Sequence, residues 1–124
     1  MEAARRILLI DDEPDFLNNL SLTLEMAGYQ ALTAMDGSEA LTILQTQAVD
    51  LIISDINMLP IGGYQLCDLV RSNPQWSKIP FLFLTGSRFV SDAEIQYGKA
   101  RGINEYLFKP IRSKDLLSAV KQAL

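Results

Sequence analysis

The strongest constraint on the fold is a set of three unbroken apolar runs, each ending abruptly at polar residues. The runs cover residues 7–10, 51–53 and 81–84, and they lead into Asp11-Asp12, Ser54-Asp55 and Thr85 respectively. An apolar run without alternation is typical of a strand that is covered on both faces, as in a parallel sheet. The sequence therefore predicts three buried strands, each of which presents a polar side chain at its carboxyl end.

Two weaker strands and five helices complete the predicted pattern. The weaker strands, at 29–34 and 105–108, contain polar residues, and helical periodicity predicts helices near 14–27, 36–47, 62–72, 91–101 and 113–124. Strictly alternating strands and helices imply a parallel sheet with right-handed crossovers. With the three continuous runs in the centre and the polar strands at the edges, the strand order is 2-1-3-4-5. The whole chain, residues 1–124, is predicted to be one doubly wound α/β domain. In its most polar helix, Ala93, Tyr97 and Ala100 form the expected inner stripe.

The composition excludes several kinds of site. A net charge of −4 and a pI near 4.7 argue against nucleic-acid binding through this domain, which requires a basic face. With no histidine and a single cysteine, Cys67, histidine-based catalysis and zinc sites within the chain are excluded, so any metal is bound by oxygen ligands. No apolar segment is long enough for a signal peptide or a membrane span, and we expect a cytoplasmic protein.

The candidate functional site lies where the strand order reverses, between the first and third strands. Ligands of open α/β sheets bind beyond the carboxyl ends of the strands at this point, where Asp11, Asp12 and Asp55 meet. Two like charges about 4 Å apart repel by roughly 4 kcal/mol at an effective dielectric near 20, so a hard cation such as Mg²⁺ (or Mn²⁺) is expected between them. Lys109 and Thr85 reach the same rim from neighbouring strands. This combination suits phosphoryl transfer to Asp55 as the nucleophile.

These residues carry a resemblance to a known family. The acidic pair after the first strand, Asp55 after the third, Thr85 after the fourth and Lys109-Pro110 after the fifth resemble, along the full chain, a receiver domain of two-component response regulators, which has a flavodoxin-like fold. The resemblance implies that Asp55 accepts a phosphoryl group from a sensor histidine kinase or a phosphotransfer protein.

The same resemblance implies further roles for individual residues. Asp12 is expected to bind the metal directly, Asp11 mostly through water, and Asn57 through its backbone carbonyl. Thr85 and Tyr106 are expected to form the switch pair, in which the hydroxyl moves onto the phosphate and the aromatic ring turns inward. Lys109 is expected to pair with the phosphoryl oxygens.

Three more expectations follow from the family. The Lys109-Pro110 peptide bond is expected to be cis, and Asn57 and Ser87 are expected to tune autodephosphorylation. The output surface is expected to comprise the fourth helix, the fifth strand and the fifth helix. It would contact a downstream effector domain, a target protein or a second copy of the chain.

One segment departs from the family pattern. The family usually has Asp-x-x-Met-Pro and then Asp-Gly before the third helix, whereas this chain has proline one place later, at Pro60, and Gly62 in place of the acid. Glycine is an acceptable N-cap, so the helix should still begin there. The changed loop bears on phosphate lifetime and kinase docking.

Three alternative functions share parts of this pattern. A flavin-binding module has the same architecture, but Asp11-Asp12-Glu13 would repel the flavin phosphate. A haloacid-type phosphohydrolase needs an aspartate acid/base two residues after its nucleophile, where this chain has Asn57. The third alternative is a receiver-like interaction module that works by binding alone, without phosphorylation.

Overall fold

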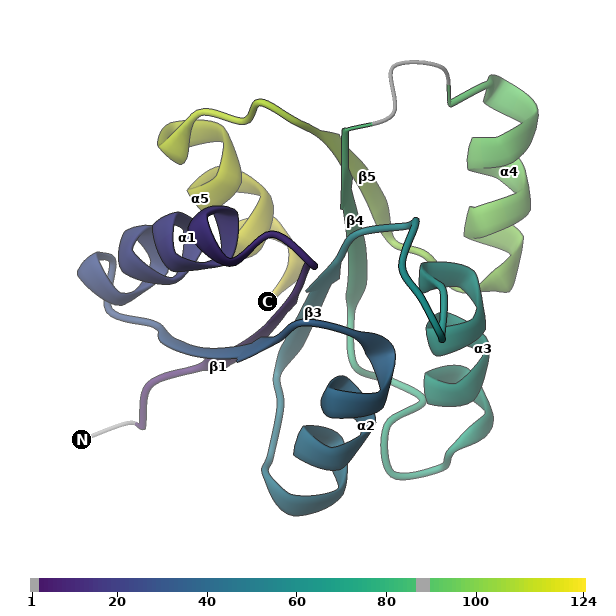
Figure 1. The fold of residues 1–124 in the computed structure, drawn as a ribbon, viewed down its shortest axis with the longest axis horizontal. Coiled ribbons are helices and arrows are strands. Elements are labelled where there is room, and N and C mark those ends of the chain that lie inside the picture. Colours follow the sequence, from purple (N-terminus) through teal and green to yellow (C-terminus); the bar gives the residue numbers. More distant parts are fainter. Residues whose placement is uncertain (1–2, 87–89) are drawn as a thin grey trace.

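The computed structural model describes residues 3–86 and 90–124 and alternates strands with helices throughout (Figure 1). The elements are β1 Arg6–Ile10, α1 Pro14–Met26, β2 Gln30–Ala34, α2 Gly37–Thr46, β3 Leu51–Ser54, α3 Gly63–Ser72, β4 Phe81–Thr85, α4 Asp92–Arg101, β5 Glu105–Phe108 and α5 Ser113–Ala123. None of the helices in these described ranges is long and apolar enough to cross a membrane.

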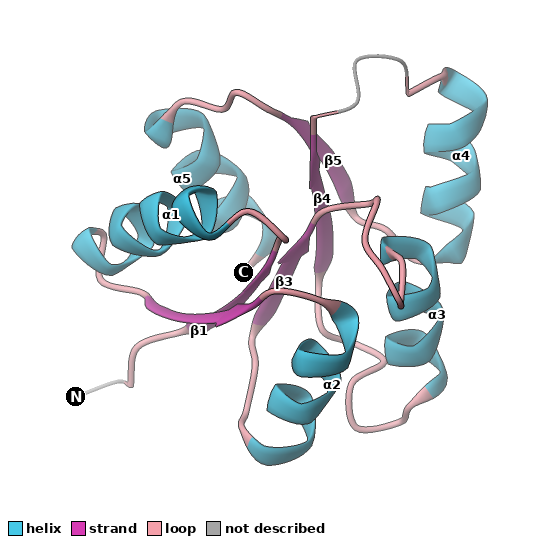
Figure 2. Ribbon diagram, in the orientation of Figure 1, coloured by secondary structure: helices cyan, strands magenta, loops and turns pink. Residues whose placement is uncertain are grey.

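The five strands form one parallel sheet in the order β2-β1-β3-β4-β5, which confirms the predicted fold class and strand order. Helices α1 and α5 cover one face, and α2, α3 and α4 lie on the other (Figures 1 and 2). Each face has its own apolar cluster, so the sheet is buried between two helical layers. Every residue of β3 and β4 is buried, whereas the edge strands β2 and β5 are partly exposed.

The expected inner stripe of α4 is wrong. Ala93, Tyr97 and Ala100 are exposed, while Ile95 packs partly against the core and Gly98 is buried. The hydrophobic pattern predicted the wrong face because α4 comes closest to the sheet at a glycine, which adds nothing to such a pattern. A Cβ atom on Gly98 would overlap the hydroxyl oxygen of Tyr106, so the missing side chain is what lets the helix lie against β5.

Candidate functional site

The first two carboxylates follow directly from β1. The backbone N–H of Asp11 donates to the carbonyl oxygen of Ala34 at 3.1 Å, which extends the sheet by one residue and buries the Asp11 side chain. Its Oδ1 accepts a hydrogen bond of 3.0 Å from the backbone N–H of Glu13. The next residue, Asp12, is exposed to solvent. One acid is thus fixed within the structure and the other faces outward.

Asp55 comes to the same place from β3. Its backbone N–H donates to the carbonyl oxygen of Ile10 at 2.9 Å, because β1 and β3 are paired with Ile10 opposite Ser54. The side chain is partly exposed, and its Oδ1 accepts a hydrogen bond of 2.7 Å from the backbone N–H of Ile56. Carboxylate oxygens of Asp11, Asp12 and Asp55 all lie within 4.8 Å of one another.

The cation of the site comes from the far edge of the sheet. The backbone N–H of Lys109 donates to the carbonyl oxygen of Thr85 at 2.8 Å. Its ammonium Nζ lies 2.6 Å from Oδ2 of Asp11 and 3.5 Å from Oδ2 of Asp55. Thr85 is buried at the end of β4, directly beside this lysine in the sheet. The structure thus brings together the candidate acids, the lysine and the threonine.

The acids change the proton affinity of Lys109. Partial burial by itself lowers the pKa of the ammonium, but the hydrogen bond to Asp11 and the charges of Asp55, Asp11 and Glu13 outweigh it, and the pKa is raised. The ammonium therefore stays charged at neutral pH. Among the described residues, it offsets one of the three carboxylate charges of Asp11, Asp12 and Asp55.

The donor set fits a divalent cation such as Mg²⁺. Hard cations of this size take oxygen ligands and commonly use one or two carboxylates together with water. Both oxygens of Asp11 already accept hydrogen bonds, from Glu13 and Lys109. Both oxygens of Asp55 also accept hydrogen bonds, from Ile56 and, at 3.5 Å, from Lys109, whereas Asp12 is exposed and is the more available ligand.

The loop between β3 and α3, which differs from the family pattern, is only partly buried. Met58 is buried, whereas the side chain of Leu59 is 88% exposed. The peptide bonds Leu59-Pro60 and Lys109-Pro110 are both cis. Helix α3 begins at Gly63 with Gly62 as its N-cap, as expected.

Gly63 itself lies close to the nucleophile candidate. A Cβ atom at this position would come within 2.6 Å of the carbonyl oxygen of Asp55. The absence of a side chain therefore allows α3 to start beside the site. Asn57 is exposed in this loop, and Ser87 lies outside the described residues.

Tyr106, the candidate switch residue, has its ring buried beneath α4 at 6% exposure. Its hydroxyl lies 2.7 Å from the hydroxyl of Tyr64 and 3.2 Å from the carbonyl oxygen of Glu94. The ring therefore lies inward in this structure, and its movement as part of a switch pair with Thr85 stays a prediction.

Sequence reasoning missed two aromatic residues near these groups. The ring of Phe16 in α1 lies 4.3 Å from Nζ of Lys109, close enough for a cation–π contact. Tyr64 in α3 contacts Tyr106 as described above. The one sequence signal for Tyr64 was a phenol at the start of a helix whose inner face is otherwise apolar. Phe16 gave no comparable signal.

Comparison with known proteins identifies the family. The model of the response regulator receiver domain matches residues 7–121. Protein RcaC of Microchaete diplosiphon is 32% identical over 124 residues, which cover 99% of this chain and 19% of that protein. A probable transcriptional regulator, ycf27 of Cyanophora paradoxa, is 35% identical over 120 residues, covering 97% of this chain and 48% of that protein.

A solved structure agrees with the family assignment. The chemotaxis response regulator CheY4 of Vibrio cholerae superposes with a TM-score of 0.90 at 36% identity, and the match covers 98% of this chain and 99% of that chain. The chain belongs to the response regulator receiver domains of two-component systems. It spans about half or less of the length of the curated relatives named above.

Proposed function

We propose that this receiver domain is a phosphoacceptor that takes a phosphoryl group from a histidine kinase or phosphotransfer protein onto Asp55. The observation that carries the proposal is the contact of Lys109 with both Asp11 and Asp55, which lie 98 and 54 positions away in the sequence. In the transfer, a carboxylate oxygen of Asp55 attacks phosphorus, and the O–P bond forms as the P–N bond of phosphohistidine breaks. The electron pair stays on the imidazole, which takes a proton from water.

The residues around Asp55 support this reaction by position and charge. Lys109 would pair with the phosphoryl oxygens as negative charge moves toward them. Thr85, at the end of β4, is a hydroxyl donor beside this lysine in the sheet. Asp12, Asp55 and the carbonyl oxygen of Asn57 would bind Mg²⁺, with Asp11 acting mostly through water. Bound there, Mg²⁺ would neutralise charge on the carboxylates and on the phosphoryl oxygens.

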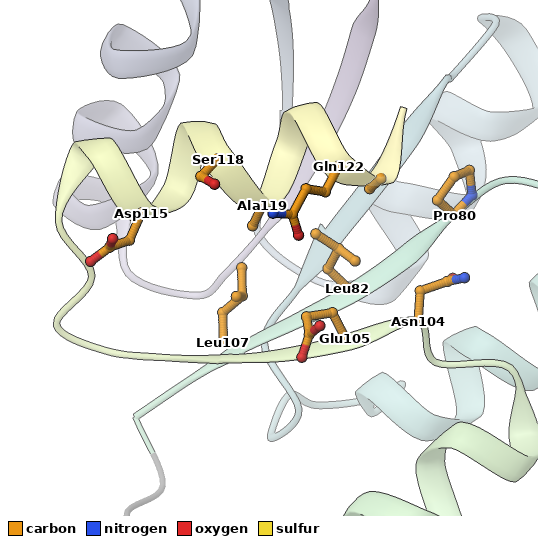
Figure 3. Close-up of a pocket in the computed structure, with 10 residues that line it drawn as sticks. Pro80, Leu82, Asn104, Glu105, Leu107, Asp115, Ser118, Ala119 and Gln122 are labelled. Carbon is orange, nitrogen blue, oxygen red and sulfur yellow. The ribbon is translucent and has the colours of Figure 1, made fainter.

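The proposed output surface comprises α4, β5 and α5. Phosphorylation would bias this surface through Thr85 and Tyr106, and moving such an equilibrium from mostly off to mostly on takes about 5.5 kcal/mol. A groove of about 430 Å³ lies between β5 and α5, with Leu82 and Leu107 on its floor and Glu105 and Asp115 at its rim (Figure 3). It gives this surface a concave, acid-edged feature for an effector domain, a target protein or a second copy.

The test is a mass measurement on the intact protein. Incubation with acetyl phosphate and Mg²⁺ should add the mass of one phosphoryl group, and chelation with EDTA should abolish the gain. Asp55→Asn should show no gain, because an amide is a poor nucleophile. Asp68→Asn removes an exposed carboxylate on α3 and serves as the matched control, which should gain mass normally.

Two outcomes would contradict the proposal. An unchanged mass gain in Asp55→Asn would place the phosphoryl group elsewhere. No gain in the wild type, even with a histidine kinase as donor, would favour a module that works by binding alone. The close approach of Lys109 to two carboxylates favours the phosphoacceptor.

A further inference from the structure

Helix α4 is held to the rest of the domain by unusually few apolar contacts. Gly98 is the only buried residue among the ten of α4, all of which the structure describes. Ile95 is partly buried against the core, and the remaining residues are mostly exposed. Polar contacts must therefore contribute a large share of the attachment.

The central polar contact is a chain of two phenols and a carboxylate. The hydroxyl of Tyr106 in β5 lies 2.7 Å from the hydroxyl of Tyr64 in α3. The Tyr64 hydroxyl donates to Oε2 of Glu94 in α4 at 3.0 Å. Side chains from α3, α4 and β5 thus meet at one partly buried point.

The proton count fixes the direction of these hydrogen bonds. The Tyr64 hydroxyl donates its proton to Oε2 of Glu94, since a carboxylate oxygen is the acceptor there. The lone pair of the Tyr64 oxygen then accepts the proton of Tyr106, whose alternative acceptor, the carbonyl oxygen of Glu94, is farther away at 3.2 Å. Burial, followed by the hydrogen bonds to Tyr106 and Glu94, raises the pKa of Tyr64, and burial raises that of Tyr106. Both phenols therefore keep their protons at neutral pH.

The rings are held in place independently of their hydroxyls. Tyr64 makes edge-to-face contacts with Phe83 and Tyr97, with ring centroids 5.0 and 5.3 Å apart. Phe83 also contacts the Tyr106 ring at 5.4 Å, and Gly98 leaves room for the Tyr106 hydroxyl beneath the helix. Removal of the Tyr64 oxygen alone would thus leave the aromatic packing largely intact.

We infer that Tyr64 is a positioning residue of the switch, whose hydroxyl holds Tyr106 in its buried position and fastens α4 through Glu94. The hydrogen bonds that join Tyr106, Tyr64 and Glu94 favour the inward position of the Tyr106 ring already in the unphosphorylated domain. The regulatory reading rests on the proposed function, since it takes the inward ring to be the state that phosphorylation favours. The structural part, attachment of α4 through Tyr64, does not depend on it.

The test compares Tyr64→Phe with a matched control, Tyr97→Phe. Loss of one buried hydrogen bond of this kind should speed amide hydrogen exchange in α4 by about three- to tenfold in the unphosphorylated protein. Tyr97 is half exposed, and its hydroxyl is not part of the hydrogen bonds that join Tyr106, Tyr64 and Glu94. Amide exchange in Tyr97→Phe should therefore match that of the wild type. A ¹⁹F spectrum of fluorotyrosine at position 106 should shift toward an exposed environment in Tyr64→Phe only.

A double-variant comparison separates the hydrogen bond from packing. If the two hydroxyls act through each other, adding Tyr106→Phe to Tyr64→Phe should accelerate amide exchange in α4 little further.

A binding measurement tests the regulatory part. In Tyr64→Phe, beryllofluoride with Mg²⁺ should bind about three- to tenfold more weakly, because the inward position of the Tyr106 ring is less populated.

The outcomes distinguish the inference from the proposed function. Unchanged exchange in α4 and an unchanged fluorine signal in Tyr64→Phe would overturn the inference, even if Asp55 is phosphorylated normally. Altered exchange with unchanged beryllofluoride affinity would overturn its regulatory part. A wild type that accepts no phosphoryl group would overturn the proposed function, and the exchange result would still decide the role of Tyr64 in fastening α4.

Discussion

At the level of single residues, Lys109 is the group on which the geometry of the acidic pocket depends. Its Nζ contacts Asp11 and Asp55 and lies over the ring of Phe16, and only 15% of the side chain is exposed. Without this ammonium, the buried Asp11 would face the carboxylates of Asp12 and Asp55 and would lose its ion pair. A hydrogen bond to a buried charged group contributes more than one between neutral partners.

Lys109→Met should lower the free energy of unfolding at neutral pH by about 1.5–3 kcal/mol, because it removes a charged hydrogen bond to a buried acid. Since the folded-state pKa of Lys109 is raised, the wild type keeps this contribution below the unfolded-state value, about 10.4, and loses it as pH rises through the folded-state value. Urea unfolding of both proteins from pH 7 to pH 11 measures the difference.

The quantity to follow is the difference in the free energy of unfolding between the wild type and Lys109→Met at each pH. The individual pH curves are less informative, because tyrosines also ionise above about pH 10. The gap should stay constant to about pH 10 and then shrink. A variant as stable as the wild type at pH 7, or a gap that widens with pH, would contradict this account of Lys109.

At the level of elements, α4 shows how a glycine can define a helix face. Alanine favours a helix interior over glycine by about 1 kcal/mol, whereas overpacking a filled site costs about 1–3 kcal/mol. At Gly98 the second effect should win, because a Cβ atom would meet the Tyr106 hydroxyl directly. The helix can yield only by moving away from β5 or by expelling the ring.

Gly98→Ala should therefore destabilise the protein by about 1–2 kcal/mol in urea unfolding. In a Tyr106→Leu background, which lacks the outer ring atoms, the same substitution should instead be neutral or stabilising by up to about 1 kcal/mol. This change of sign is the signature of the contact. Equal effects in both backgrounds would mean that Gly98 is needed for some other reason.

The elements that sequence could predict are those encoded by local pattern. The strand centres, their order and the positions of Asp11, Asp55 and Lys109 follow from apolar runs and from the shared edge of a parallel sheet. The contact between Tyr64 and Tyr106 could not be predicted, because it depends on side-chain directions from two elements 42 residues apart. The inner face of α4 was misjudged because its closest approach to the sheet is at Gly98, and a glycine gives no hydrophobic signal.

At the level of the whole molecule, Arg71 ties the amino end of the sheet together. Its guanidinium donates to the carbonyl oxygens of Ser77, Ile79 and Gly102 at 2.7–3.2 Å, and to Oδ1 of Asn104. These acceptors belong to the loop before β4 and to the turn between α4 and β5. One side chain of α3 thus links two connections at the opposite end of the strands from Asp55.

Arg71→Lys should destabilise the domain by about 1–3 kcal/mol, because lysine keeps the charge but cannot reproduce the planar set of donors. Urea unfolding measures the effect, and Arg112→Lys, at the exposed start of α5, should change stability little. Phosphorylation of folded Arg71→Lys should proceed normally, because the carboxyl ends of the strands are untouched. A variant as stable as the wild type would contradict the assigned role.

The most direct test of the central claim is to locate the phosphoryl group chemically. Borohydride reduces an acyl phosphate to an alcohol, so a phosphorylated aspartate becomes homoserine, which peptide mass spectrometry identifies by position. After treatment with acetyl phosphate and Mg²⁺, we expect homoserine at position 55 and unmodified aspartate at Asp11 and Asp12. Homoserine at either of those positions, or at none, would contradict the claim that the strand ends assemble a phosphoacceptor site around Asp55.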